Sequence, residues 1–160
     1  MGVKIVAASL AEHYDVARVL FREYQASLNI DLCFQSFEEE LAGLPGKYAP
    51  PKGRLLLAFG EDDSPAGVIA MRPIDGDICE MKRLFVRPAA RGQNLGRKLI
   101  DRVLEEAREA GYTKMRLDTL IGLMDKAIAL YRSYGFYDIP AYYQSPMPNE
   151  LYLEKDLGAR

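Results

Sequence analysis

Hydrophobic and polar positions follow two different periods along the chain, and each change of period marks the boundary of a predicted element. Short apolar runs bounded by Gly, Pro or Asp-rich turns predict β-strands, whereas apolar positions three or four residues apart predict helices. The predicted strands cover residues 4–9, 54–59, 67–74, 78–86, 114–119, 136–139 and 150–157.

The helical period predicts two helices in the first third of the chain. The first has one apolar stripe, made of Val16, Leu20, Tyr24 and Leu28, with Val19 beside it. The second begins at Ser36, which stands three residues before Glu39 in the pattern of a capping box. It ends before Pro45, because the residue that precedes a proline disfavours helical backbone.

Two further helices are predicted in the second half. Residues 96–111 carry the longest helical pattern, and Gly111 stands where a C-cap belongs. Its predicted buried stripe consists of Leu99, Val103, Leu104 and Ala107. Residues 125–135 form the fourth predicted helix, which ends at Gly135.

The order of these elements, β-α-α-β-β-β-α-β-α-β-β, indicates the fold class. Strand 78–86, helix 96–111 and strand 114–119 suit a right-handed crossover between parallel strands. The Asp-Gly turn within residues 74–77 joins antiparallel neighbours. The sequence therefore predicts an α/β (α+β) fold with a mixed, mostly antiparallel, twisted sheet and helices on both faces, and one domain over residues 1–160.

Composition excludes several classes of protein. Hydrophobic residues make up 49% and charged residues 28%, with a net charge of −2, so we expect a soluble protein that does not bind nucleic acid. No apolar run approaches the roughly 20 residues of a membrane helix, and the N-terminal apolar segment is too short for a signal peptide. We therefore expect a cytoplasmic protein without a membrane partner. Cys33, Cys79 and His13 cannot complete a Cys/His metal set, so no metal is expected.

The hexapeptide Arg-Gly-Gln-Asn-Leu-Gly at residues 91–96 raises a question of charge. Arg97 and Lys98 follow it in the first turn of a helix, where the macrodipole disfavours cations. A helix N-terminus with nearby glycines and Asn94 can bind an anion through its unpaired N–H groups, and cations then become favourable. The alternative is an ordinary strand-to-helix turn with solvated basic side chains.

At this point the chain resembles the GNAT superfamily of N-acetyltransferases. The family motif R/Q-x-x-G-x-G/A matches residues 91–96, except that Asn94 replaces the first motif glycine. Asn tolerates the same left-handed backbone, so we expect weaker but retained binding of pyrophosphate. Residues 83–88 resemble the family's "RLYVxP", and residues 127–136 resemble the helix that ends in "LYxxxGF". The resemblance covers most of the chain and is most specific between residues 80 and 136.

The resemblance implies acetyl-CoA as cosubstrate, in a gap between strands 78–86 and 114–119. The backbone of Leu84, Phe85 and Val86 would pair with the acetyl carbonyl and the pantetheine arm, as an added strand does. The pyrophosphate would be held by the backbone N–H groups of Arg91, Gly92, Gln93, Asn94, Leu95, Gly96 and Arg97. Met124 stands where family members often carry an asparagine, which removes one polar contact to pantetheine.

The resemblance also assigns catalytic candidates. Tyr131 matches the tyrosine that protonates the leaving thiolate, although it could instead be a packed aromatic on a helix stripe. Glu80 and, as a second candidate, Asp118 could accept the proton of the amine, whereas the alternative for Glu80 is an ion pair. Strict alternation places Glu80, Lys82, Leu84 and Val86 on one face of the strand, and Met81, Arg83 and Phe85 on the other.

Nothing in the sequence resembles a covalent nucleophile set, because Cys79 has only His13 as a possible imidazole partner. Direct transfer of the acetyl group in a ternary complex is therefore expected.

Two segments, residues 24–51 and 139–150, match those that shape the acceptor pocket in similar proteins. Their acidic and aromatic residues, which suit a small cationic amine, are Asp31, Glu38, Glu39, Glu40, Phe34, Tyr48, Tyr142 and Tyr143. The alternative is a solvated acidic helix face with Phe37 and Leu41 inward, and tyrosines that pack the later loop.

The expected function is an N-acetyltransferase for a primary amine of a small molecule. A catalytically silent acyl-CoA sensor or interaction module and a protein or peptide N-acetyltransferase are the alternatives. A homodimer is an open possibility, and the sequence names neither the amine nor the length of the acyl chain.

Overall fold

The computed structural model of the chain describes residues 2–28, 37–122, 124–143 and 149–158. The main elements are β1 (Lys4–Ala7), α1 (Ala11–Leu28), α2 (Phe37–Ala42), β2 (Arg54–Phe59), β3 (Pro65–Asp75), β4 (Ile78–Val86), α3 (Leu95–Glu109), β5 (Lys114–Leu120), α4 (Asp125–Ser133), β6 (Tyr137–Asp138) and β7 (Glu150–Asp156). The predicted order of strands and helices is confirmed. The predicted cap at Ser36 lies outside the described residues.

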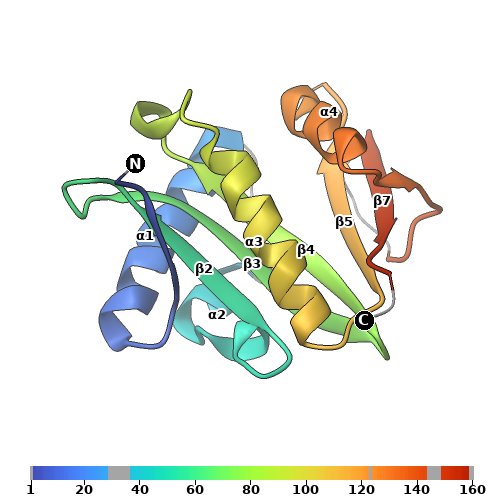
Figure 1. Cartoon of the computed structure of the whole chain (residues 1–160), viewed down its shortest axis with the longest axis horizontal. Coiled ribbons are helices and arrows are strands. Elements are labelled where there is room, and N and C mark those ends of the chain that lie inside the picture. Colours follow the sequence, from blue (N-terminus) through green and yellow to red (C-terminus); the bar gives the residue numbers. More distant parts are fainter. Residues whose placement is uncertain (1, 29–36, 123, 144–148, 159–160) are drawn as a thin grey trace.

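The strands form one sheet in the order β1-β2-β3-β4-β5-β7-β6. β4 and β5 are parallel, and the other paired strands are antiparallel. In Figure 1, α3 and α4 lie in front of the sheet, and α1 and α2 lie behind it. The predicted mixed α/β fold, with a mostly antiparallel sheet and helices on both faces, is therefore confirmed.

Each face of the sheet has its own apolar core. The stripe predicted for α3 is fully buried against the front face, and its members are Leu99, Val103, Leu104 and Ala107. On the rear face, α1 buries Ala17, Leu20 and Phe21. Val19, which stands beside the predicted stripe, is 49% exposed. Val19 lies about 200° around the helix from Ala17, so it cannot share the buried face.

A bulge in β4 changes which side chains face which core. Arg83 has a positive φ of 62°, and the pairing register between β3 and β4 shifts at this point. Lys82 and Arg83 consequently both lie on the rear face, where Lys82 is opposite Ala70. The predicted alternation was wrong beyond Lys82, because Leu84 and Val86 pack against the front core.

β4 and β5 pair over only three positions. Ile78, Cys79 and Glu80 lie opposite Lys114, Met115 and Arg116, and the two strands then separate. We call this point of separation the fork. In Figure 1 the two strands diverge from the lower right towards α4 and the beginning of α3. The predicted gap between these strands is confirmed, and it leaves residues 81–86 without a strand partner on the side of β5.

Candidate active site

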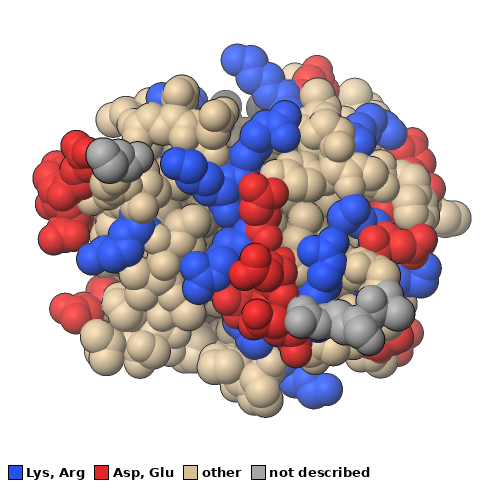
Figure 2. Space-filling view, in the orientation of Figure 1, with Lys and Arg blue, Asp and Glu red and all other residues tan. Residues whose placement is uncertain are grey.

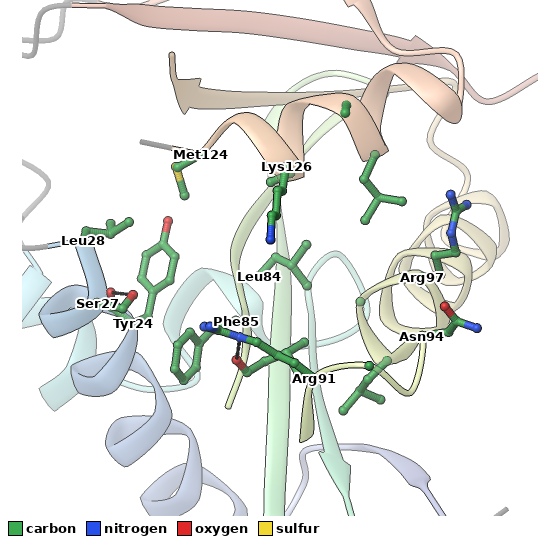
Figure 3. Close-up of a pocket in the computed structure, with 17 residues that line it drawn as sticks. Tyr24, Ser27, Leu28, Leu84, Phe85, Arg91, Asn94, Arg97, Met124 and Lys126 are labelled. Carbon is green, nitrogen blue, oxygen red and sulfur yellow. Dashed lines mark hydrogen bonds between the residues drawn. The ribbon is translucent and has the colours of Figure 1, made fainter. Parts of the chain in front are cut away.

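A cleft of about 820 Å³ opens at the fork, between the beginnings of α3 and α4 and the end of α1 (Figure 3). We call it the fork cleft. Its lining residues are Tyr24, Ser27, Leu28, Leu84, Phe85, Val86, Arg91, Gly92, Asn94, Leu95, Gly96, Arg97, Met124, Lys126, Ala127, Ala129 and Leu130. Its volume lies in the range of small-molecule sites.

All the predicted cofactor-binding residues except Gln93 line the fork cleft. Gln93 instead lines a hollow beside the turn between β2 and β3, together with Gly60 and Ser64. It stands between Gly92 and Asn94, which both have positive φ, so the chain reverses around it. The strand edge of β4 and the motif loop therefore line the same cleft, whereas Gln93 lies outside it.

Asn94 adopts the left-handed backbone that the motif glycine would supply. Its φ and ψ are 58° and 26°, which confirms the expectation that asparagine tolerates this region. Asn94 is the N-cap of α3, but its side chain makes no capping hydrogen bond. The first turn of α3 also contains no acidic residue. The N–H groups at this helix start are therefore available to an anion.

The fork cleft is electropositive. Arg91, Arg97 and Lys126 line it, and its described lining contains no Asp or Glu. Figure 2 shows basic side chains gathered in the upper middle of the molecule, between the beginning of α3 and α4. Nε of Arg91 donates a 3.2 Å hydrogen bond to the carbonyl of Val86, and the guanidinium of Arg97 lies 5.8 Å from the centre of the Tyr134 ring. These charges suit phosphate groups.

Lys126 was not predicted as a site residue, although a signal existed. It stands in the first turn of α4, where a cation is as unfavourable to the helix dipole as Arg97 is in α3. In Figure 3 its side chain points into the fork cleft towards Leu84. Lys98, in contrast, is exposed and does not line the cleft.

Tyr131 lies one turn after Ala127 in α4 and is 5% exposed. Its ring centre is 5.8 Å from that of Phe136, and its hydroxyl makes no hydrogen bond to any residue that the structure describes. Burial raises the pKa of Tyr131, and Tyr24 and the carboxylate of Asp118 raise it further. The phenol therefore keeps its proton at neutral pH and has it free to donate.

Glu80 is enclosed by partners, and its side chain is 1% exposed. Nε of Arg72, on the neighbouring strand, donates to Oε1 at 2.8 Å, and the Tyr142 hydroxyl donates to Oε2 at 2.7 Å. Nζ of Lys82 is 3.9 Å from Oε1. The structure thus contains the ion pair that the sequence left open as an alternative role for Glu80.

Asp118 lies on β5 just beyond the fork, and its side chain is 11% exposed. The hydroxyl of Tyr143 donates to Oδ2, and Nζ of Lys82 lies 4.0 Å from Oδ1. Burial lowers the pKa of Lys82, although Glu80 and Asp118 oppose that shift. Lys82 was not predicted as a site residue, and its position between two carboxylates depends on strand pairing that the sequence does not display.

Of the three acidic residues of α2, Glu38 and Glu39 are exposed, as a solvated face predicts, whereas Glu40 is partly buried. Phe37 and Leu41 are buried, as predicted, but Glu40 forms two hydrogen bonds with Arg83 at 2.9 and 3.0 Å. It also accepts a hydrogen bond from Tyr48. The expectation of a solvated side chain was therefore wrong for Glu40. The predicted pocket residues Asp31 and Phe34, and also Cys33, lie outside the described residues.

Cys79 and His13 do not form a nucleophilic pair. Cys79 is buried, and burial raises the pKa of its thiol to about 12. His13 accepts hydrogen bonds from the N–H groups of Ser9 and Leu10 at the beginning of α1. Within the described ranges no group of three His, Cys, Asp or Glu side chains could hold a metal ion. No helix in the described part of the chain is long and apolar enough to cross a membrane.

Known proteins resemble this chain over most of its length. The model of the Acetyltransferase (GNAT) family matches residues 15–136. An uncharacterized N-acetyltransferase of Schizosaccharomyces pombe is 38% identical over 158 residues, which covers 98% of this chain and 96% of that relative.

Solved structures with the same fold include an acetyltransferase of the GNAT family from Staphylococcus aureus. It has a TM-score of 0.81 and 20% identity, and the match covers 98% of this chain and 99% of that one. An acetyltransferase from Salmonella typhimurium, solved with its cofactor acetyl-CoA, has a TM-score of 0.66 and 19% identity over 100% and 96% of the two chains.

Proposed function

Because the chain belongs to the GNAT family of acetyltransferases, we propose that it moves the acetyl group of acetyl-CoA to a primary amine of a small molecule. The transfer is direct, within a ternary complex. One observation carries this proposal: the fork cleft joins an unpaired strand edge, an electropositive helix start and the neighbourhood of a buried phenol. We extend the proposal to a cytoplasmic location, as the composition predicts.

The residues of the fork cleft fit the parts of acetyl-CoA, which supplies the acetyl group as an activated thioester. The N–H groups at the beginning of α3, with Arg91 and Arg97, suit the pyrophosphate. The unpaired edge of β4 from Leu84 to Val86 suits the amide groups of the pantetheine arm. Nε of Arg91 already donates to the carbonyl of Val86 at this edge, which holds its guanidinium beside the strand.

Tyr131 is the proposed general acid. The neutral amine attacks the acetyl carbon, the C–N bond forms, and the C–S bond breaks as the tetrahedral intermediate collapses. The departing thiolate takes the proton of the Tyr131 hydroxyl. The Tyr131 phenol is protonated at neutral pH, so a proton is present when the thiolate forms. The nitrogen loses its second proton as the amide forms, and Tyr131 is reprotonated through solvent.

Asp118 is the proposed general base, in preference to Glu80. Both oxygens of Glu80 accept short hydrogen bonds, and its side chain is almost inaccessible. Among the residues that the structure describes, Oδ1 of Asp118 pairs with Nζ of Lys82 at 4.0 Å and accepts no short hydrogen bond, and the side chain is more exposed than that of Glu80. The charge of Asp118 also acts on Tyr24 and Tyr131, on opposite faces of the fork. These interactions support Asp118, rather than Glu80, as the carboxylate that serves the reacting groups.

The buried thiol of Cys79 supports direct transfer over an acyl-cysteine route. Its raised pKa leaves almost no thiolate at neutral pH. The imidazole of His13 accepts a hydrogen bond from the N–H group of Ser9 at the beginning of α1, whereas the end of α1 lines the fork cleft. The amine therefore receives the acetyl group from the thioester itself.

The decisive experiment is a calorimetric titration with acetyl-CoA, followed by an assay of CoA thiol release on panels of small amines and of peptides. We expect micromolar binding and thiol release with at least one small primary amine. Arg91→Ala should weaken binding about tenfold through the loss of a charge-assisted hydrogen bond. Lys98→Ala is the matched control, because this exposed cation lies outside the fork cleft, and it should leave the Kd unchanged.

Each alternative has its own outcome in these assays. Binding without thiol release on either panel would identify a silent acyl-CoA-binding module. Release with peptides alone would identify a protein acetyltransferase. No binding at millimolar acetyl-CoA would contradict the proposal as a whole.

A further inference from the structure

The hydroxyl of Tyr143 lies between two carboxylates. It is hydrogen-bonded to Oδ2 of Asp118 and lies 3.0 Å from Oε1 of Glu150. A tyrosine hydroxyl has one proton to donate, whereas an ionised carboxylate only accepts. The hydroxyl can therefore donate to only one of the two carboxylates at a time. It can bond to both at once only when one carboxyl carries a proton and donates it to the tyrosine oxygen.

Asp118, Tyr143 and Glu150 form a chain of neighbouring groups that begins next to the fork. Asp118 is on β5, next to the fork, and its side chain is 11% exposed. Glu150 begins β7 and is partly exposed. Tyr143 bridges the two from the segment before β7. The series thus connects the proposed position of the amine with a carboxylate that water reaches.

Packing holds the bridging hydroxyl in place. The rings of Tyr142, Tyr143 and Tyr152 pack edge to face, with centres 5.3 to 5.7 Å apart. The hydroxyl of Tyr152 also donates to the carbonyl of Tyr143 at 3.2 Å. Burial raises the pKa of Tyr143, and Asp118 and Glu150 add to that shift. Tyr143 is therefore a neutral phenol that can pass a proton without becoming a phenolate.

The surroundings of Asp118 favour the arrival of a cation. Lys82 of β4 is the cation near its Oδ1, and Glu80 lies on the other side of Lys82. The remaining titratable groups that Asp118 influences are Tyr24 of α1, Tyr131 of α4, Tyr142 beside Tyr143, and Tyr152 of β7. These tyrosines are neutral, and the single charge of Lys82 is shared between Glu80 and Asp118, so Asp118 keeps negative charge that suits an ammonium group.

We propose that Asp118, Tyr143 and Glu150 form a relay that carries the proton of the acceptor out of the active site. The proposal rests on the proposed function, since it assigns the path of the proton that the amine must lose. The ammonium group gives a proton to Asp118 and becomes the nucleophilic amine. Tyr143 accepts that proton as it donates its own to Glu150, which releases it to water. Asp118 is again a carboxylate, Tyr143 is again neutral, and one proton has left the amine.

The first test needs no acceptor. The ¹³C carboxyl shifts of Asp118 and Glu150 are followed by NMR across pH in the wild type and in Glu150→Gln, Tyr143→Phe and Tyr142→Phe. Groups that share a hydroxyl titrate as a pair, so Glu150→Gln and Tyr143→Phe should both change the titration curve of Asp118. Tyr142→Phe is the matched control, because it removes a hydroxyl from the same ring cluster that bonds Glu80 instead. If the titration curve of Asp118 is the same in the wild type and in all three variants, the relay is overturned.

The second test compares two amines of similar size. Benzylamine is an ammonium ion at neutral pH, whereas aniline is already a free base and needs no deprotonation. Tyr143→Phe and Glu150→Gln should lower kcat/KM for benzylamine about tenfold or more and leave aniline unchanged. In these variants kcat/KM for benzylamine should rise with pH as the free amine accumulates.

The outcomes separate the relay from the proposed function. Equal losses on both amines, or no loss on either, would overturn the relay while acetylation stands. If the wild type acetylates neither amine, the proposed small-amine acceptor fails for this class, and the titration of Asp118 alone decides whether the proton chain exists. A thermal melt of each variant shows that the comparison is made on folded protein.

Discussion

The two sides of the fork are built in different ways. The fork cleft consists of a strand edge, a helix start and a loop, with three cations and no carboxylate among its described lining residues. The region behind β4 and β5 consists of side chains from α2, β3, β4, β5, β7 and the segment before β7, in which carboxylates are bonded to arginines and tyrosines. We call this second region the carboxylate network.

This difference suits the two ligands of the proposed reaction, the cosubstrate acetyl-CoA and the acceptor amine. A phosphate-bearing cosubstrate can be held by backbone N–H groups and exposed cations, which tolerate some variation in sequence. An amine that must lose a proton needs a particular carboxylate in a particular protonation state. The cleft is therefore built from consecutive residues, whereas the carboxylate network depends on how distant strands are brought together.

The largest effect is expected for the ion pair between Arg83 and Glu40. The Arg83 side chain is 2% exposed and binds both oxygens of Glu40. Arg83→Met would leave Glu40, whose side chain is only 17% exposed, without this partner, at a cost of about 3 kcal/mol in the free energy of unfolding. Urea denaturation measures this change.

The matched control is an ion pair of another glutamate of α2, Glu38, with Arg22 of α1. Arg22→Met removes a bidentate pair with Glu38 whose side chains are 57% and 61% exposed, so it should cost less than about 1 kcal/mol. A double variant, Arg83→Met with Glu40→Gln, should regain part of the loss, because no charge is then left unpaired. Equal stability of the two single variants would mean that burial does not distinguish these ion pairs.

The second prediction concerns the hydroxyl of Tyr131, the proposed general acid. Tyr131→Phe removes the proposed acid while it keeps the ring against Phe136, so kcat should fall about 100-fold. Binding of acetyl-CoA should be unchanged, because the hydroxyl bonds no residue of the described cleft. Steady-state kinetics and calorimetry measure the two quantities separately.

Tyr134→Phe is the control for this variant. Its hydroxyl bonds Asp101 at 2.6 Å and the carbonyl of Arg97, on the side of α3. It should retain a rate near that of the wild type. A full rate for Tyr131→Phe would remove the acid role and leave Tyr131 as a packing residue.

Most of the fold could be predicted because the apolar periods are local. The stripe of α3 and the strand runs are visible in consecutive residues, and so is the motif loop that lines the fork cleft. The assignment of faces in β4 failed beyond Lys82, since the bulge at Arg83 depends on the register with β3. A period of two cannot show a residue that is inserted without a partner.

The carboxylate network could be predicted only in part for a similar reason. Glu80 and Asp118 were recognisable as candidates from their places on two strands. Their partners were not, because Tyr142 is 62 residues from Glu80 in the chain, and Tyr143 is 25 residues from Asp118. Glu40 likewise depends on Arg83, which is 43 residues away. Side-chain bonds over such separations leave no periodic signal.

The smallest predicted effect tests whether the cleft depends on backbone shape rather than on side chains. Asn94 has a φ of 58° and its side chain makes no capping bond, so its contribution is conformational. Asn94→Gly should therefore leave the melting temperature and the Kd for acetyl-CoA almost unchanged. Asn94→Ala keeps the β-carbon but removes the short polar side chain that lets asparagine adopt the left-handed region, so it should cost about 1 kcal/mol of stability, with a similar loss in binding. If the Asn94→Ala and Asn94→Gly variants bind acetyl-CoA equally well, the left-handed turn before α3 does not determine the shape of the anion site. The cations at Arg91, Arg97 and Lys126 would then have to account for the affinity by charge alone.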